Sequence, residues 1–157
     1  IYAMLRLELI DGAGLPTAEC LSINALPKPE SAPFFGPSSR GWRFRRLRFL
    51  DRVPAALEEI WLDASWVDEI VAEEVSESLY LFYREKLGLA IMSAEDRVSL
   101  RAVPEWADPS VAVSTGVRAG FVERIARDPT GAAVEYSHTW FDPETVRYTN
   151  RIGKGSA

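Results

Sequence analysis

One stretch of the chain decides the fold, Arg46-Leu47-Arg48-Phe49-Leu50-Asp51-Arg52-Val53-Pro54-Ala55-Ala56-Leu57-Glu58-Glu59. It predicts a β-hairpin with strands over residues 42–50 and 55–62. Side chains alternate between the two faces of a strand, so Arg46 and Arg48 share a face with Trp42, Phe44 and Leu50. Burying a charge without a partner costs several kcal/mol. The two arginines therefore require a counter-ion, which can be a carboxylate of the protein, an anionic ligand, or both.

The length of the hairpin loop decides which carboxylate meets the arginines. A three-residue loop over Asp51–Val53 pairs Arg46 with Glu58, whereas a two-residue loop pairs position 46 with 57 and sends Glu58 to the opposite face. We predict the three-residue loop. Glu58 then neutralises Arg46 in the empty site or accepts a hydrogen bond from a ligand, and a purely structural salt bridge is the alternative. Arg43 and Arg45 point to the other face.

Length and composition describe one ordinary globular domain. The chain has 157 residues, is 47% hydrophobic and carries a formal charge of −5. This acidic balance argues against a broad nucleic-acid-binding surface. Six arginines nevertheless lie between residues 40 and 52, which suits a compact anion. No apolar run approaches the ~20 residues of a membrane helix, so no membrane partner is expected.

Cysteine and histidine are scarce. With Cys20 alone, no intrachain disulfide can form, and a cytoplasmic location is expected. With His138 as the one histidine, a zinc site is not expected, and we predict neither a metal nor a cofactor. No signal peptide is recognisable. The chain begins at Ile1 rather than with methionine, which fits a piece of a longer protein.

The remaining patterns predict an α+β fold in which a mostly antiparallel sheet packs against a few short helices. Further strands are expected over residues 17–26, 89–103, 120–127, 133–141 and 146–150. Asp128-Pro129-Thr130-Gly131 is a strong turn signal between two of them. Helices are expected over residues 2–11, for two turns from Ser65, from Ser78 to a stop at Gly88, and briefly from Asp108. The proline-rich residues 27–41 are expected to form a loop.

Three motifs, in order and at fixed intervals, resemble those of one family. They comprise Arg46-Leu47-Arg48 with Asp51, Pro54, Ala56, Glu58 and Glu59; Ser78-Leu79-Tyr80 before a helix that ends at Leu87-Gly88; and Arg124, Asp128, Gly131, Val134-Glu135, Ser137 and Trp140-Phe141. The chain resembles the UTRA domain, the effector-sensing domain of GntR-type transcription factors of the HutC branch. That domain shares its fold with chorismate lyase. The likeness covers roughly residues 17–150.

The resemblance implies a ligand-binding domain over residues 1–152, with a disordered tail over 153–157. It also implies a small anionic effector, such as a sugar phosphate, an amino acid or another small carboxylate, and a homodimer formed through the sheet. DNA would be bound only by an N-terminal winged-helix domain that is absent from this chain. The chain departs from the family at Asp142–Tyr148, which replaces an Arg-Gly-Asp-like segment, and at Phe141, where a tyrosine is common.

Strand parity and the resemblance together give eight candidate ligand-binding residues: Arg46, Arg48, Glu58, Ser78, Leu79, Tyr80, Glu135 and Phe141. A guanidinium fork grips carboxylate or phosphate bidentately. Ser78 and the amides of Leu79 and Tyr80 offer hydrogen bonds at a helix start, although an N-cap role alone is the alternative for Ser78. Glu135 can equally be an exposed charge and Phe141 plain core. His138 is given no role.

Three functions are open to this pattern. The favoured one is a regulatory ligand-binding domain, in which the effector binds one arrangement of a dimer better than another. The second is a chorismate lyase-like enzyme that acts on a small carboxylate. The third is a dimerisation module that has lost its ligand. The sequence shows no serine–histidine or cysteine–histidine pairing, so we predict that the domain is not an enzyme.

Overall fold

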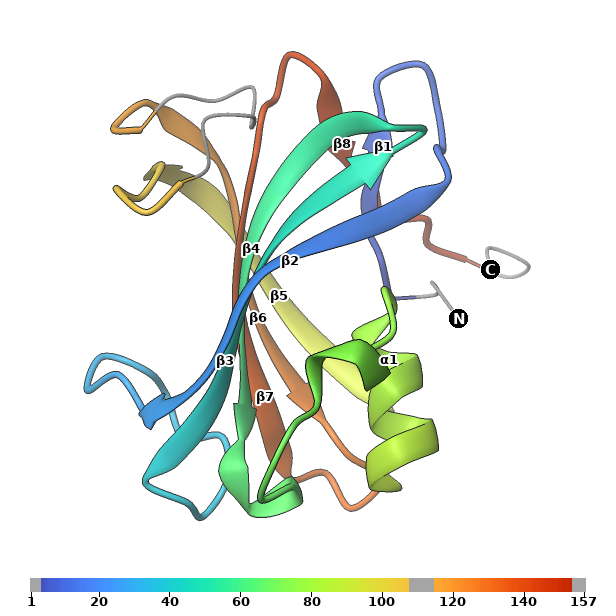
Figure 1. Cartoon of the computed structure of the whole chain (residues 1–157). Helices are drawn as coiled ribbons and strands as arrows, with labels where there is room; N and C mark the ends of the chain where they lie inside the picture. Colours follow the sequence, from blue (N-terminus) through green and yellow to red (C-terminus); the bar gives the residue numbers. More distant parts are fainter. Residues whose placement is uncertain (1–3, 108–114, 154–157) are drawn as a thin grey trace.

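Six strands form one antiparallel sheet that dominates the structure (Figure 1). The computed structural model describes residues 4–107 and 115–153. The strand order is β2-β3-β4-β7-β6-β5, with every neighbouring pair antiparallel. The strands are β2 (Pro16–Pro27), β3 (Arg40–Leu50), β4 (Val53–Asp63), β5 (Ser93–Ala102), β6 (Arg118–Arg127) and β7 (Ala133–Phe141). The predicted α+β class with a mostly antiparallel sheet is confirmed.

Most of the predicted strands are confirmed within a few residues. The largest difference is β5, which starts at Ser93 rather than at residue 89. The β6–β7 turn forms as predicted, because Asp128 Oδ1 accepts hydrogen bonds from the amides of Thr130 and Ala132 at 2.9 and 3.1 Å. Gly131 supplies the positive φ of 84° that this turn requires. The helix predicted from Asp108 and residues 154–157 of the predicted tail lie outside the described residues.

The β3–β4 hairpin has the predicted pairing but a different loop. Asp51 and Arg52 have φ angles of 48° and 66°, and they form a two-residue turn. The prediction of a three-residue loop is therefore wrong. The ladder then skips Ala55, which forms a β-bulge in β4. Because the bulge inserts the residue that the loop lacks, Arg46 still pairs with Glu58.

A separate two-stranded sheet joins the two ends of the described chain. It pairs β1 (Leu7–Leu9) with β8 (Val146–Tyr148) in antiparallel fashion. The last predicted strand is thus confirmed, whereas the helix predicted over residues 2–11 is wrong in its described part. The segment Leu5-Arg6-Leu7-Glu8-Leu9 alternates with period two, which is a strand pattern. Its leucines pack beside buried Val146.

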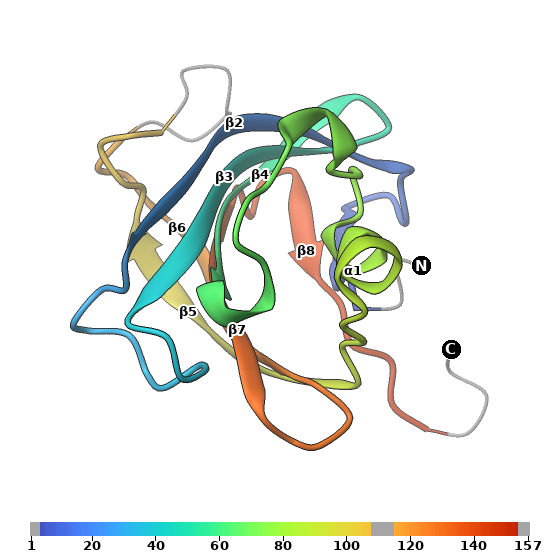
Figure 2. The ribbon, with the colours of Figure 1, turned by 60° about the horizontal axis from the view of Figure 1, so that its bottom comes forward.

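One helix packs against a face of the sheet (Figures 1 and 2). It consists of α1 (Leu79–Phe82) and a π-helical turn η3 (Tyr83–Leu87). Ser78 caps its start, since Ser78 Oγ accepts a hydrogen bond from the amide of Leu81 at 3.3 Å. Gly88 ends it in the left-handed region at φ 68°. Both ends agree with the prediction, and the buried face of the helix contacts Phe44 and Leu62 of the sheet.

The helix predicted from Ser65 is wrong. The structure has two isolated 3₁₀ turns, η1 (Ala64–Trp66) and η2 (Ala72–Glu74), joined by extended chain. Val67, which has φ −159°, ends the first turn, and the β-branched residues nearby disfavour helix. Ser65 does not cap a helix, because its hydroxyl donates a hydrogen bond to buried Asp63.

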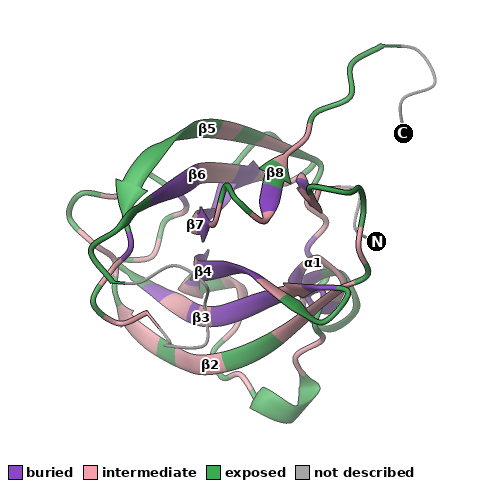
Figure 3. Cartoon of the chain, turned by 90° about the horizontal axis from the view of Figure 1, so that it is seen from above, coloured by how far each residue is buried: buried purple, intermediate pink, exposed green. Residues whose placement is uncertain are grey.

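Burial follows the position of each strand in the sheet. The central strands carry most of the buried residues, and no residue of the edge strands β2 and β5 is buried (Figure 3). Within residues 4–107 and 115–153, no helix is long and apolar enough to cross a membrane. The central strands β3, β4, β6 and β7 are thus held firmly by their buried residues. They form a fixed base for the side chains that point toward α1.

Candidate functional site

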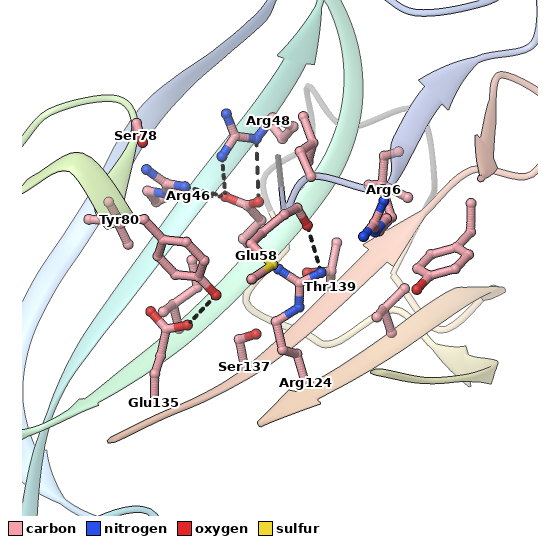
Figure 4. Close-up of a pocket in the computed structure, with 17 residues that line it drawn as sticks. Arg6, Arg46, Arg48, Glu58, Ser78, Tyr80, Arg124, Glu135, Ser137 and Thr139 are labelled. Carbon is pink, nitrogen blue, oxygen red and sulfur yellow. Dashed lines mark hydrogen bonds and ion pairs between the residues drawn. The ribbon is translucent and has the colours of Figure 1, made fainter. Parts of the chain in front are cut away.

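A cavity of about 110 Å³ lies between the central strands, the start of α1 and the N-terminal segment (Figure 4). On the same measure a single water needs roughly 10–15 Å³, so the cavity has room for a small molecule. Seven of the eight predicted site residues line it: Arg46, Arg48, Glu58, Ser78, Leu79, Tyr80 and Glu135. The cavity therefore brings together three distant parts of the chain. They are the hairpin, the start of the helix, and β7, which follows the hairpin by about 80 residues.

Phe141 is the exception among the predicted residues. It does not line the cavity but packs in the core with Leu50 and Val146. Its ring fills the space beside Gly120, where a Cβ atom would stand 2.4 Å from the ring. The structure therefore places Phe141 in the core, the alternative that the sequence left open.

Arg46 and Arg48 share one carboxylate. Arg46 donates to Glu58 Oε1 from Nε at 3.1 Å and from Nη2 at 2.8 Å. Arg48 makes longer contacts, from Nε to Oε2 at 3.3 Å and from Nη2 to Oε1 at 3.5 Å. All three residues are buried, with 3%, 5% and 6% of their surfaces exposed. Burial alone would raise the pKa of Glu58, but Arg48 and Arg46 outweigh it and lower that pKa.

This triad leaves one positive charge in excess, because two guanidinium groups face a single carboxylate. Arg46 also donates from Nη1 to the carbonyl of Glu77 at 2.8 Å, which fixes the start of the helix against the sheet. The corresponding contact of Arg48, to the carbonyl of Thr17, measures 3.5 Å. Hydrogen bonds of this length are weak, so Arg48 is less well satisfied than Arg46.

Glu135 forms an acceptor site at the other side of the cavity. Tyr80 donates to its Oε1 at 3.0 Å, and Tyr83 donates to its Oε2 at 2.5 Å. Glu135 is 2% exposed, and this burial raises the pKa of its carboxyl group. The alternative that Glu135 is an ordinary exposed charge is thus excluded. Tyr83, whose side chain is completely buried, was missed by the sequence analysis because its helical position indicated only core packing.

Arg124 is a second residue that the sequence analysis did not assign to the site. It donates to Asp96 Oδ1 from Nε at 2.6 Å and to Oδ2 from Nη2 at 2.9 Å. It reaches the cavity because Arg124 pairs with Ser137 across β6 and β7, and Ser137 lies two residues from Glu135. Counting outward from the pair Arg127–Ala133 would put Arg124 opposite Tyr136, on the other face. A bulge that leaves Val134 unpaired shifts the register and brings Arg124 to the face of Glu135. Other lining residues that were missed include Arg6, Ser137, Thr139 and Tyr148.

The opposite face of the sheet has a different set of polar groups. Arg45 pairs there with Glu59 at 3.0 Å, as strand parity predicts, and Arg43 lies on that face too. His138 hydrogen-bonds through Nε2 to the hydroxyl of Tyr136 at 2.7 Å, and burial lowers the pKa of its imidazole. No group of three potential metal ligands occurs among the residues that the structure describes.

Comparison with known proteins defines the class to which this fold and cavity belong. The sequence model of the UTRA domain matches residues 13–147. The chain therefore belongs to the UTRA domain family. It is also 51% identical over 152 residues to a protein of Agrobacterium fabrum named HTH-type transcriptional regulator SmoD. The match takes in 97% of this chain but 65% of that protein, so the chain spans less than two thirds of its relative.

Solved structures support the same fold. The ligand-binding domain of a candidate GntR-family transcriptional regulator from Bordetella bronchiseptica superposes with a TM-score of 0.79, at 18% identity, over 95% of this chain and 97% of that one. A GntR-family transcriptional regulator from Bacillus cereus gives a TM-score of 0.71, at 22% identity, over 88% of this chain and 99% of that one. These likenesses extend over nearly the whole chain, so they confirm the predicted fold.

Proposed function

We propose that this chain is the effector-sensing domain of a GntR-type transcriptional regulator of the HutC branch, acting in the cytoplasm. It binds a small anionic metabolite and passes the binding signal to a winged-helix DNA-binding domain that precedes residue 1 in the whole protein. Membership of the UTRA family and the similarity to SmoD support this proposal. Both also favour a regulator over a chorismate lyase-like enzyme, and the domain then needs no catalytic residue.

One observation carries the ligand class: two buried arginines share a single buried glutamate beside an open cavity. Their excess positive charge is costly because both guanidinium groups are buried. A carboxylate, phosphate or similar group offsets that charge and provides the planar acceptors that guanidinium prefers. We assign the anion to Arg48 first, because its present contacts with Glu58 are the longest in the triad.

The rest of the cavity suits a ligand with hydrogen-bond donors away from its anionic end. Glu135 offers acceptor oxygens, and Thr139 and Ser137 add hydroxyl groups from the same strand. A sugar phosphate or an amino acid carries an anionic group and separate hydroxyl or ammonium donors. In a homodimer, such a ligand acts by binding one arrangement of the two subunits more tightly than another.

A thermal-shift panel tests this function. Small carboxylates, amino acids and sugar phosphates are added to the native chain and to Arg48→Ala. A ligand at about 100 times its Kd should stabilise the native chain by about 2.7 kcal/mol, which is about 5–10 °C for a domain of this size. The shift should fall to about half or less in Arg48→Ala, as a loss of affinity of at least about tenfold requires. A panel without any shift favours the module that has lost its ligand, and equal shifts in both proteins refute the arginine assignment.

The coding sequence upstream of residue 1 gives a second test. A winged-helix segment there is expected from the proposal. A natural start codon immediately before Ile1 would contradict it, because the domain would then have no DNA-binding partner in its own chain.

A further inference from the structure

The N-terminal segment Met4–Leu7 forms one wall of the cavity. All four of its residues line the cavity opposite the helix start. Leu5 and Leu7 pack beside Val146, and Leu7 pairs with Tyr148 in the β1–β8 sheet. The amide of Thr149 donates to the carbonyl of Arg6 at 2.6 Å, and Arg124 Nη2 donates to the carbonyl of Met4 at 2.7 Å. The second contact comes from inside the cavity, from a side chain that also lines it.

Arg124 is rigidly placed for this contact. Its bidentate pair with Asp96 fixes the plane of the guanidinium, and Asp96 is itself held by the hydroxyl of Tyr148 at 2.7 Å. Arg124 and Tyr80 both line the cavity. Burial would lower the pKa of Arg124, but hydrogen bonding to Asp96 and the interaction with Tyr80 raise it overall. Tyr80 in turn donates to Glu135, so Arg124, Tyr80 and Glu135 present polar groups to the same cavity.

We propose that Arg124 is a positioning residue that couples the polar groups of the cavity to the placement of the segment Met4–Leu7. A ligand that contacts Arg124 in the cavity acts on the segment through this guanidinium, which also donates to the carbonyl of Met4. This inference rests on the proposed function, in which the segment leads to the DNA-binding domain. The new element is the route by which a ligand in the cavity changes the placement of the segment Met4–Leu7.

The sign of the coupling follows from the geometry. A cavity whose segment has detached lacks one wall, so a ligand that touches this wall binds the attached state more tightly. By linkage the ligand then favours attachment of the segment to the same degree. Arg124 links the wall to the cavity, because its side chain lines the cavity and also donates to the carbonyl of Met4.

Hydrogen exchange measured by mass spectrometry on a peptide covering residues 4–9 tests the coupling without any ligand. Arg124→Gln should speed exchange of this peptide about tenfold, the factor expected for losing one charge-assisted hydrogen bond. Arg127→Gln is the matched control, because Arg127 lies on the same strand but donates to the carbonyl of Gly131 at 3.0 Å, away from the segment. Peptides from β3 and β4 report whether each variant keeps its fold.

A double-mutant cycle separates coupling from simple loosening. Tyr80→Phe should speed exchange of the peptide in the native background and have no further effect in Arg124→Gln. Arg124→Lys, which keeps the charge but lacks the fork, should resemble Arg124→Gln and serves if the glutamine variant does not fold. The proposal is overturned if Arg124→Gln behaves like Arg127→Gln, or if Tyr80→Phe has the same effect in both backgrounds. Since no ligand is used, a thermal-shift panel without hits would refute the proposed function but not this coupling.

Discussion

Replacing Glu58 tests the energetic core of the site, because this one carboxylate neutralises two buried arginines. Glu58→Gln keeps the shape of the side chain but leaves both guanidinium groups without a counter-ion. Removing one partner of a buried ion pair costs about 3–5 kcal/mol. That is a large part of the roughly 5–15 kcal/mol by which domains are stable, so the variant should be folded but close to its limit.

The adjacent residue provides the matched control. Glu59 pairs with Arg45 on the opposite face, where the two side chains are 15% and 23% exposed. Glu59→Gln removes the same charge one position away and should cost only about 0.2–1 kcal/mol. Urea unfolding of both variants at low salt measures the difference. A Glu58→Gln variant that loses no more stability than Glu59→Gln would refute the claim that the arginines depend on Glu58.

The pH dependence gives an independent reading of the same interaction. The pKa of Glu58 is lowered in the folded state, so its contribution is present above the unfolded pKa of about 4.5 and is lost as the pH falls through the folded pKa. The stability gap between the native chain and Glu58→Gln should therefore be full at pH 7 and shrink in acid. Added sulfate should also stabilise Glu58→Gln more than Glu59→Gln, because the anion can replace the missing carboxylate. Glu59→Gln serves as the control for the general effect of sulfate on stability.

Three further substitutions test the local structure around the cavity. Ser78→Ala should cost about 1 kcal/mol in urea unfolding, because the amide of Leu81 loses its cap, and an unchanged midpoint would contradict that role. Gly88→Ala should cost about 1 kcal/mol through its positive φ alone, since nothing lies within 4 Å of the added Cβ, whereas Gly88→Asn should cost less. Glu135→Gln should change how the stability depends on pH. Burial raises the pKa of Glu135, so the native chain loses stability as the pH rises from 4.5 through the folded pKa. The variant should show no such loss. Parallel unfolding curves for the two proteins across that window would contradict the assignment.

The sequence predicted the parts of the site that depend on strand parity and on local capping. Alternation put Arg46, Arg48 and Glu58 on one face, and the Ser78 cap and Gly88 stop set the bounds of the helix. The hairpin pairing was right although its loop was wrong, because the bulge at Ala55 made up for the shorter turn. A bulge has no reliable local signal, so turn length alone could not have given the register.

The missed residues depend on contacts between distant segments. Arg124 reaches the cavity only because β6 lies beside β7, and the role of Met4 depends on a β1–β8 pair that links the two ends of the described chain. The leucine-rich start was read as helix because composition outweighed its period-two alternation. Phe141 was placed by resemblance at the site, whereas the absence of a side chain at Gly120 draws its ring into the core.

Recognition of the anionic end of a ligand by Arg46 and Arg48 is the basis of the proposed function. Calorimetric titration tests it most directly, using the compound that gives the largest thermal shift with the native chain, Arg48→Ala and Arg45→Ala. Arg45 lies three positions before Arg48 on the same strand, and it faces away from the cavity. The Arg45 variant therefore removes a charge without touching the site. Arg48→Ala should weaken binding at least about tenfold, as loss of a charge-assisted hydrogen bond requires, while Arg45→Ala should bind like the native chain. Equal affinity in all three proteins would contradict it.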